Sequence, residues 1–192
     1  MTTSRISIKF FFENPHFPRE KVVPIFHRWI QEQSLSGHLL IDVASYEHIA
    51  EGPGVVLVSH EANIVIDNTD GRMGVLYQRK RIAPGPFART LSACLSAVLE
   101  CCSKLELDPE IGPQAKIKTD ELVLKILDSL AAPNEPATLE KIRPELDQVL
   151  KQVFDGAVAI EQKIDPVRPF ELHIKAKQKS NLMDLIDRNV VA

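Results

Sequence analysis

The chemistry that this sequence could support begins with a histidine beside a glutamate, at His60 and Glu61. In the motif HExxH, two histidines one helical turn apart bind zinc and the glutamate acts as general base. Position 64 is Ile, so the second histidine is missing. The surrounding residues VVLVSHEA also predict a strand, in which neighbouring side chains point to opposite faces. Residue identity and expected geometry therefore both exclude a metalloprotease motif.

Asp42 is a second candidate, because it interrupts the apolar run from Leu39 to Ala44. An unpaired carboxylate is costly to bury, so we expect a cation or hydrogen-bond donors beside it. Two interpretations stay open: an ion pair that holds sheet to helix, or an acid/base or metal-binding carboxylate. The expected partners on neighbouring elements are His60, Arg72, Arg79 and Arg28. The candidate catalytic residues are Asp42, His60 and Glu61.

Polar side chains on expected loops are the candidates for ligand binding, because functional groups concentrate on loops that a rigid sheet carries. Convergence of Asp42, His48 and His60 would make a two-histidine, one-carboxylate site for a divalent transition metal. The histidines are scattered singly, however, and no His or Cys pair has ligand spacing, so we expect no metal and no cofactor. The candidate ligand-binding residues are Tyr46, His48, Asp67, Arg72, Arg79 and Arg81.

Three cations, Arg79, Lys80 and Arg81, end an expected strand shortly before a helix that begins at Phe87. Backbone donors at that helix N-terminus could join them in holding a phosphate or carboxylate. The sequence has no Walker loop and no glycine-rich dinucleotide fingerprint, so a solvated strand end is the other interpretation. The basic strands also lack most of the aromatic residues needed to stack on bases, and we expect no nucleic-acid partner.

Short strands must position most of these residues. Between Leu39 and Lys80, four apolar or β-branched runs are separated by Gly, Pro, Asn and Asp, which predicts a meander of strands. The turn NTDG at positions 68–71 predicts a hairpin within it. The other expected elements are a strand at 5–12, a helix at 18–33, a helix at 87–105, a strand at 117–127, a helix at 138–154, a hairpin of 157–163 with 170–177, and a short helix that Ser180 caps. Lysines alternate along 173–179, which is typical of an edge strand.

The expected helix at 87–105 is apolar or small almost all round, which predicts burial within the protomer or between two protomers. We expect part of it, or an adjacent sheet edge, to lie in a two-fold dimer interface. Cys94 and Cys101 lie too far apart on this helix for a disulfide, and a bond between Cys101 and Cys102 would be strained. Three reduced thiols indicate a cytoplasmic location.

The resulting fold class is α+β, with a mixed or antiparallel sheet packed against amphipathic helices. The 192 residues predict a single domain at 1–192, with a sub-division into 1–108 and 114–192 as the alternative. Residues 5–80 and 117–178 each read strand, helix, strand, strand. Such a repeat indicates two duplicated halves, with chance as the competing explanation.

Four segments, FHRWIQ at 26–31, LLIDVASYEH at 39–48, GPGVVLVSHEANIVID at 52–67 and GRMGVLYQRKR at 71–81, together resemble an uncharacterised bacterial protein family. The resemblance covers about the first 80 residues of the sequence. It implies no activity and assigns no site residue.

Composition narrows the classes of function that remain. A formal net charge of -3 gives no polyanion-binding signal, and no run approaches the roughly 20 apolar residues that span a bilayer. The favoured expectation is a non-enzymatic cytosolic binding or protein-interaction module that acts as a homodimer, recognises a small anionic ligand or a protein partner, and has no membrane partner. The alternative is a metal-assisted hydrolase or isomerase that uses carboxylates and histidines of the strands at 39–67.

Overall fold

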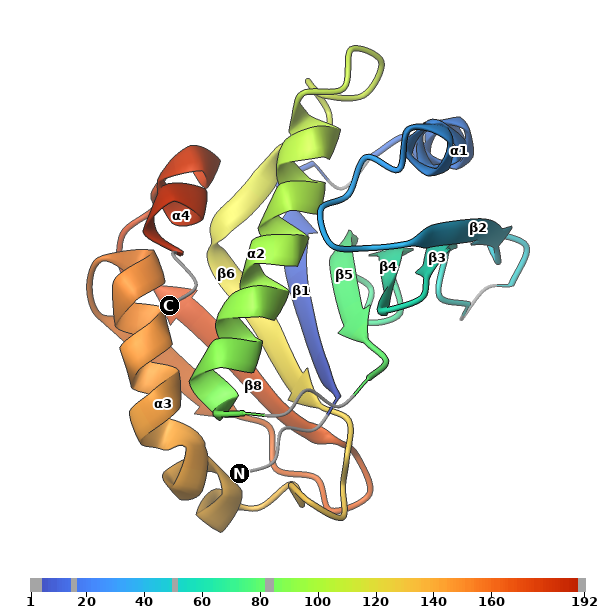
Figure 1. Cartoon of the computed structure of the whole chain (residues 1–192). Coiled ribbons are helices and arrows are strands. Elements are labelled where there is room, and N and C mark those ends of the chain that lie inside the picture. The colour runs from blue at the N-terminus through green and yellow to red at the C-terminus, as the bar shows by residue number, and fades with distance from the viewer. Residues whose placement is uncertain (1–4, 15–16, 50–51, 82–84, 190–192) are drawn as a thin grey trace.

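One antiparallel sheet of eight strands forms the framework of the protein (Figure 1). The computed structural model describes residues 5–14, 17–49, 52–81 and 85–189. The strands are β1 Ile6–Phe12, β2 Leu40–Ser45, β3 Val55–Ser59, β4 Ala62–Asp67, β5 Gly74–Arg79, β6 Ile117–Ile126, β7 Val158–Gln162 and β8 Phe170–Ala176. The helices are α1 Val22–Glu32, α2 Phe87–Glu106, α3 Pro136–Phe154 and α4 Leu182–Arg188, and a 3-10 turn, η1 Arg19–Lys21, precedes α1. The α+β class is therefore confirmed.

The strand order is β2-β3-β4-β5-β1-β6-β8-β7. The opening strand β1 is central, and it pairs antiparallel with β5 on one side and β6 on the other. Along the chain, the part that begins with β1 and the part that begins with β6 each run strand, helix, antiparallel strands, helix. The edges of the sheet are β2 and β7, so the expectation that the lysine-rich strand β8 is an edge strand is wrong. Strand order depends on long-range pairing, which the local alternation of lysines does not encode.

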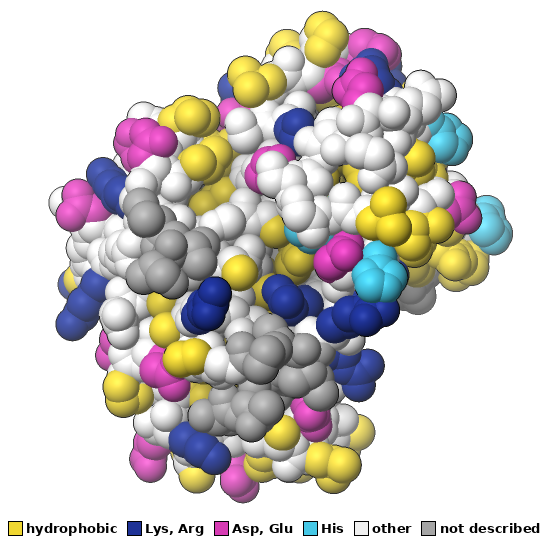
Figure 2. All heavy atoms as spheres, in the orientation of Figure 1, with side chains coloured by type: hydrophobic (Ala, Val, Ile, Leu, Met, Phe, Trp, Pro, Cys, Tyr) yellow, Lys and Arg dark blue, Asp and Glu magenta, His cyan; other side chains and the backbone are white. Residues whose placement is uncertain are grey.

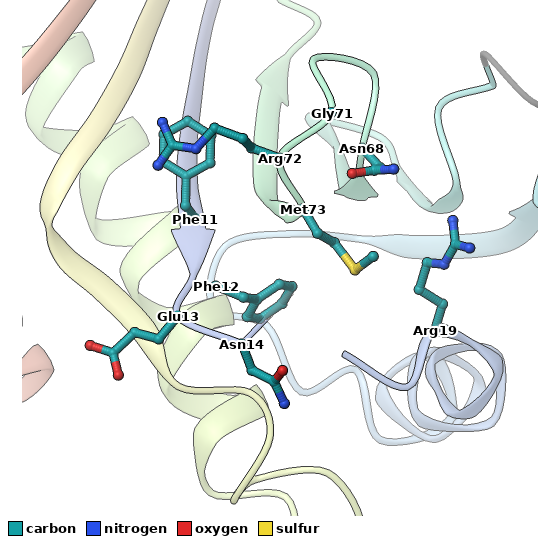
Figure 3. Close-up of a pocket in the computed structure, with 9 residues that line it drawn as sticks. All are labelled: Phe11, Phe12, Glu13, Asn14, Arg19, Asn68, Gly71, Arg72 and Met73. Carbon is teal, nitrogen blue, oxygen red and sulfur yellow. The ribbon is translucent and has the colours of Figure 1, made fainter. Parts of the chain in front are cut away.

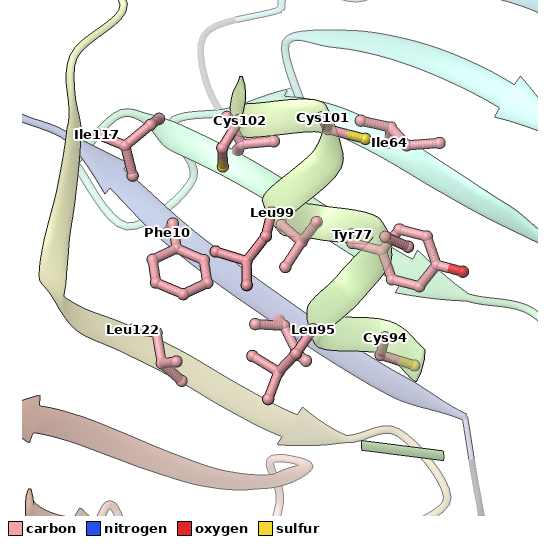
Figure 4. Packing of buried hydrophobic residues seen from close by; sticks show 14 of the residues in the cluster. Phe10, Ile64, Tyr77, Cys94, Leu95, Leu99, Cys101, Cys102, Ile117 and Leu122 are labelled. Carbon is pink, nitrogen blue, oxygen red and sulfur yellow. The ribbon is translucent and has the colours of Figure 1, made fainter. Parts of the chain in front are cut away.

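The helices share a single apolar core with one face of the sheet. The even-numbered residues Ile6, Ile8 and Phe10 of β1 are fully buried in this core. Figure 1 shows α2 crossing in front of β1, and Figure 4 shows its apolar side chains, with Leu95 and Leu99 among them, packed beside Phe10. The large area of apolar surface removed from water here provides the main driving force for folding.

The three cysteines of α2 belong to this core as free thiols. Burial raises the pKa of Cys94 to about 11, and it also raises the pKa values of Cys101 and Cys102. A thiol must lose its proton to act as a nucleophile or a metal ligand. Within the protomer these cysteines therefore serve as small packing residues.

Local sequence signals place most element boundaries correctly. The NTDG turn joins β4 to β5, where Gly71 has a φ of 74° and its N–H donates to the carbonyl of Asn68. The last helix is capped by Asn181 rather than by Ser180, because the Asn181 side chain accepts from the backbone of Asp184 in a capping box.

In the described residues, no helix is long and apolar enough to cross a membrane.

Candidate functional site

The candidate site is a pocket of about 380 Å³ at the end of β1, beside the turn of the β4–β5 hairpin (Figure 3). Three segments form it: the end of β1, the turn η1 that follows shortly after it, and residues 68–73, which are distant in sequence from both. The lining residues are Phe11, Phe12, Glu13, Asn14, Arg19, Asn68, Gly71, Arg72 and Met73.

Two side chains give the pocket an apolar floor. The ring of Phe12 stacks on that of Phe17, with 4.1 Å between ring centroids and 7° between ring planes. The side chain of Met73 extends toward the opening in Figure 3, and the Met73 carbonyl accepts a hydrogen bond from the backbone N–H of Phe12 at 3.0 Å. A flexible thioether beside an aromatic ring can adapt to apolar groups of different shapes.

Polar groups surround the same opening. Figure 3 shows the guanidinium of Arg19 and the side-chain amide of Asn68 on the side of the pocket that Met73 enters. Arg19 interacts weakly with Glu47 of the β2–β3 loop, because 3.9 Å separates Nε from Oε1. Its side chain is 42 % exposed, so the guanidinium can turn toward a ligand at little cost. Arg19 therefore provides an adjustable cation at the rim.

Arg72, in contrast, is held in place as part of the wall. Its guanidinium lies 3.7 Å from the ring centroid of Phe11 and donates to both carboxylate oxygens of Glu121, at 2.7 and 3.0 Å. These charged hydrogen bonds lower the pKa of Glu121, although its burial acts in the opposite direction. Bidentate pairing and stacking together fix the orientation of an arginine. Arg72 thereby fastens the hairpin to β1 and β6.

A buried lysine also secures the turn end of the hairpin. Nζ of Lys9 lies 2.6 Å from Asp67 Oδ2 and 2.6 Å from Asp70 Oδ1, and the Lys9 side chain is only 5 % exposed. Burial disfavours the ionised form of Asp70, but the hydrogen bond and the charge of Lys9, together with hydrogen bonds from the backbone, outweigh burial and lower the pKa of Asp70. The first residue of β5, Gly74, allows β5 to approach β1 closely, because a Cβ there would lie 2.1 Å from the carbonyl oxygen of Phe10.

The expected ligand-binding residues do not gather in one place. Arg72 lines the pocket, while Asp67 holds the hairpin through Lys9. Tyr46 and His48 are exposed on the β2–β3 loop. Arg79 ends β5, at the end of that strand away from the β4–β5 turn, and its Nε donates to the carbonyl of Arg81. Sequence reasoning missed Arg19, Asn68, Met73 and Phe12, which the pairing of β1 with β5 and the fold of η1 bring together.

Asp42 is exposed, so the expectation that it is buried beside a cation is wrong. The reason is that β2 is an edge strand whose register with β3 shifts between Leu40 and Asp42. The Asp42 carboxylate accepts from the backbone N–H of Val43 at 2.8 Å. Nearby, the Gln33 side chain bonds both the N–H and the carbonyl of Leu40. Asp42 and Gln33 thus occupy backbone groups of β2, which limits pairing with another strand.

His60 and Glu61 lie in the β3–β4 turn, not on opposite faces of a strand. Ser59 shapes the turn, because its hydroxyl donates to the Ala62 carbonyl and accepts from the Ala62 N–H. His60 Nδ1 lies 3.0 Å from Glu61 Oε1, and its Nε2 lies 2.5 Å from Nη2 of Arg81. An arginine can only donate, so Nε2 accepts and Nδ1–H donates to Glu61. The basic nitrogen of His60 is therefore already occupied.

Glu61 is tied into the same turn. Burial opposes its ionisation, but hydrogen bonds from the backbone N–H of Leu39 and from His60 outweigh this effect and lower its pKa. A carboxylate with a lowered pKa is a weaker general base. The pair His60 and Glu61 therefore closes the turn and connects it to the start of β2.

The three residues of the metal alternative do not converge. His48 precedes β3 and His60 follows it, and a strand of five residues spans about 16 Å. Within the ranges that the structure describes, no group of three or more His, Cys, Asp or Glu side chains could hold a metal ion. The geometry gives the metal-assisted alternative no support.

Comparison with known proteins adds no assignment, since no family model and no curated protein matches the sequence.

Proposed function

We propose that the protein is a non-enzymatic cytoplasmic binding module that acts as a homodimer, and that the pocket at the end of β1 binds a small carboxylate with an attached apolar group. The observation that carries this proposal is the arrangement of Arg19 and Asn68 around an opening floored by Met73 and Phe12.

The charge of the ligand follows from Arg19. A guanidinium presents several donors in a planar fork that matches a carboxylate, and such charged hydrogen bonds are stronger than neutral ones. Among the residues that the structure describes, the ionic contact of Arg19 is the 3.9 Å approach to Glu47, which a ligand can replace. The amide of Asn68 can add a donor to the second carboxylate oxygen.

The apolar part of the ligand follows from the floor. Phe12 is 7 % exposed and Met73 is partly buried against the core, so an aromatic or branched aliphatic group can lie on them. Pockets for small molecules usually combine such apolar surface with a few polar groups that fix orientation. The volume of about 380 Å³ suits a ligand of this size.

The absence of reactive groups from the described lining favours binding over catalysis. Among its nine residues the acid is Glu13, whose carboxylate pairs with Lys179 and points away from the opening in Figure 3. A nucleophile beside a base would be needed for acyl or group transfer, and the nine residues provide no such pair. The free, buried cysteines of α2 support a cytoplasmic location for this module.

The test is calorimetric titration with benzoate and with benzamide, which have similar shapes but differ in charge. Benzoate should bind and benzamide should bind at least about tenfold more weakly, because a charged hydrogen bond contributes roughly 1.5–3 kcal/mol. R19Q should lose the preference for benzoate. The matched control is R168Q, since Arg168 lies in the β7–β8 loop with a 76 % exposed side chain.

Three results would contradict the proposal. They are no benzoate binding by the wild type, equal affinity for the two probes, or an R19Q variant that binds benzoate as well as R168Q does.

A further inference from the structure

The outward side of α2 carries an apolar groove that the protomer leaves open. The groove has a volume of about 480 Å³ and lies between the C-terminal half of α2 and α4. Figure 2 shows hydrophobic side chains at the surface over α4 and toward its border with α2. Leu107 is 78 % exposed and Met183 is 54 % exposed, although both could have been polar without loss to the core. Exposed apolar side chains around a hollow mark an interaction surface.

The groove is preformed rather than a gap between loosely packed helices. Asn189, at the end of α4, donates to the backbone carbonyl of Ser92 and to the hydroxyl of Ser96 on α2. On the other side of α4, Gln152 of α3 donates to the carbonyl of Arg188. Leu99 forms a fully buried floor between the two helices. The groove is therefore already ordered before a partner binds, and binding would cost little conformational entropy in the groove.

We propose that this groove is the contact between two copies of the chain, in which the α2 helices pack antiparallel about a two-fold axis. The α2 residues that line the groove repeat at helical spacing, from Ser96 through Glu100 and Ser103 to Leu107. They form a single stripe about 16 Å long, given a rise of 1.5 Å per residue. Such a stripe can pack against a copy of itself.

The residue types on the stripe are self-complementary. In an antiparallel pair centred between positions 101 and 102, Leu107 of each copy faces Ser96 of the other. A large side chain thus meets a small one, and each Leu107 enters the hollow between α2 and α4. Within its own protomer, Glu100 accepts through Oε1 from the backbone N–H and the hydroxyl of Ser36, at 3.1 and 3.0 Å. In the antiparallel arrangement this anchored carboxylate lies beside Lys104 of the other copy, so opposite charges face each other at the rim. A second copy provides both matches at once, whereas an unrelated protein would have to provide them separately.

This inference takes up the dimer part of the proposed function and is independent of the pocket at the end of β1. Benzoate binding and self-association are measured separately, so one can fail while the other holds.

Sedimentation velocity of the full chain over a dilution series tests the inference. The wild type should form dimers, and L107E should weaken them by about a hundredfold or more, because a charge would have to be buried without a partner. The matched control is L130E, since Leu130 is 99 % exposed in the loop after β6. Circular dichroism should show that both variants remain folded.

A mixing experiment identifies the geometry of the contact. E100K and K104E should each weaken self-association, since like charges would then face each other across the axis. An equimolar mixture of the two variants should form heterodimers of about wild-type affinity, because every rim contact again joins opposite charges. A monomeric wild type, a dimeric L107E or a mixture that does not recover would each overturn the proposal.

Discussion

The two faces of the central strand β1 are both buried, but by different kinds of interaction. Toward the helices, Ile6, Ile8 and Phe10 are buried in the apolar core. Although Figure 1 shows the labelled helices on that side of the sheet, Lys9 and Phe11 on the opposite face are nearly as inaccessible. There the β4–β5 hairpin reaches across the strand and is held by ion pairs.

This difference indicates a division of roles. The stabilisation from apolar packing grows with the apolar area that is removed from water, so the helix-covered face provides most of the stability. Ion pairs near the surface contribute less to stability, but they fix the orientation of the side chains that form them. The hairpin face therefore positions the pocket. The predictions below test whether the two faces really differ in this way.

The largest effect is expected on the helix-covered face. F10A removes a fully buried aromatic ring beneath α2 and should lower the free energy of unfolding by about 3–5 kcal/mol, through lost burial and the cavity left behind. Urea denaturation followed by circular dichroism measures this loss. If F10A lowered the free energy of unfolding by less than substitutions on the hairpin face do, the assignment of stability to the core would be contradicted.

The buried lysine should give the next largest effect. D67N leaves Lys9 with Asp70 as its remaining partner and should cost about 2 kcal/mol, since the buried charge of Lys9 is then only partly compensated. Replacing both partners, as K9M with D67L, should cost less than D67N alone, because apolar groups of similar size need no partner. A double variant less stable than D67N would show that the ion pair itself stabilises the fold.

The third effect is smaller and depends on pH. The carboxylate of Glu121 has a pKa lowered from its ordinary 4.5 by the hydrogen bonds from Arg72. A group with a lowered pKa stabilises the folded state above its unfolded pKa, and this stability is lost as the pH falls through the folded value. Unfolding free energy should therefore fall below about pH 4.5 in the wild type, and it should fall less steeply in E121Q.

Denaturation at a series of pH values compares E121Q with E140Q, a substitution at an exposed position of α3. At neutral pH E121Q should cost about 1 kcal/mol, because the half-exposed Arg72 is screened by water. Equal slopes for both variants between pH 3 and pH 5 would show that the Arg72–Glu121 contact does not hold the hairpin.

Local patterns were sufficient to predict the strands and the hairpin, because the information lies in neighbouring residues. Alternation along 5–12 marks β1, and the glycine of NTDG marks a turn that needs a positive φ. The exposure of Asp42 could not be predicted, since an edge strand and a central strand have the same local pattern. The turn at His60 depends on the two hydrogen bonds between the Ser59 hydroxyl and the backbone of Ala62, and the strand-like pattern of the flanking residues concealed it.

The candidate site was less accessible to sequence reasoning for a related reason. Arg19 lies about 50 positions before Asn68 and Met73, and the three residues meet because β1 pairs with β5 in one particular register. The NTDG signal located the hairpin, but it could not show which face of the sheet the hairpin covers. Arg72 was predicted for its charge, whereas its partners Phe11 and Glu121 follow from the pairing of β1 with β6.

The most direct test of the division between the two faces is hydrogen–deuterium exchange with and without benzoate. Benzoate should slow exchange of the backbone amides at 68–73 and around Arg19, where the pocket lies, and should leave residues 91–105 of α2 unchanged. R19Q should abolish this protection. Protection confined to α2, or no change at the hairpin at saturating benzoate, would contradict the account.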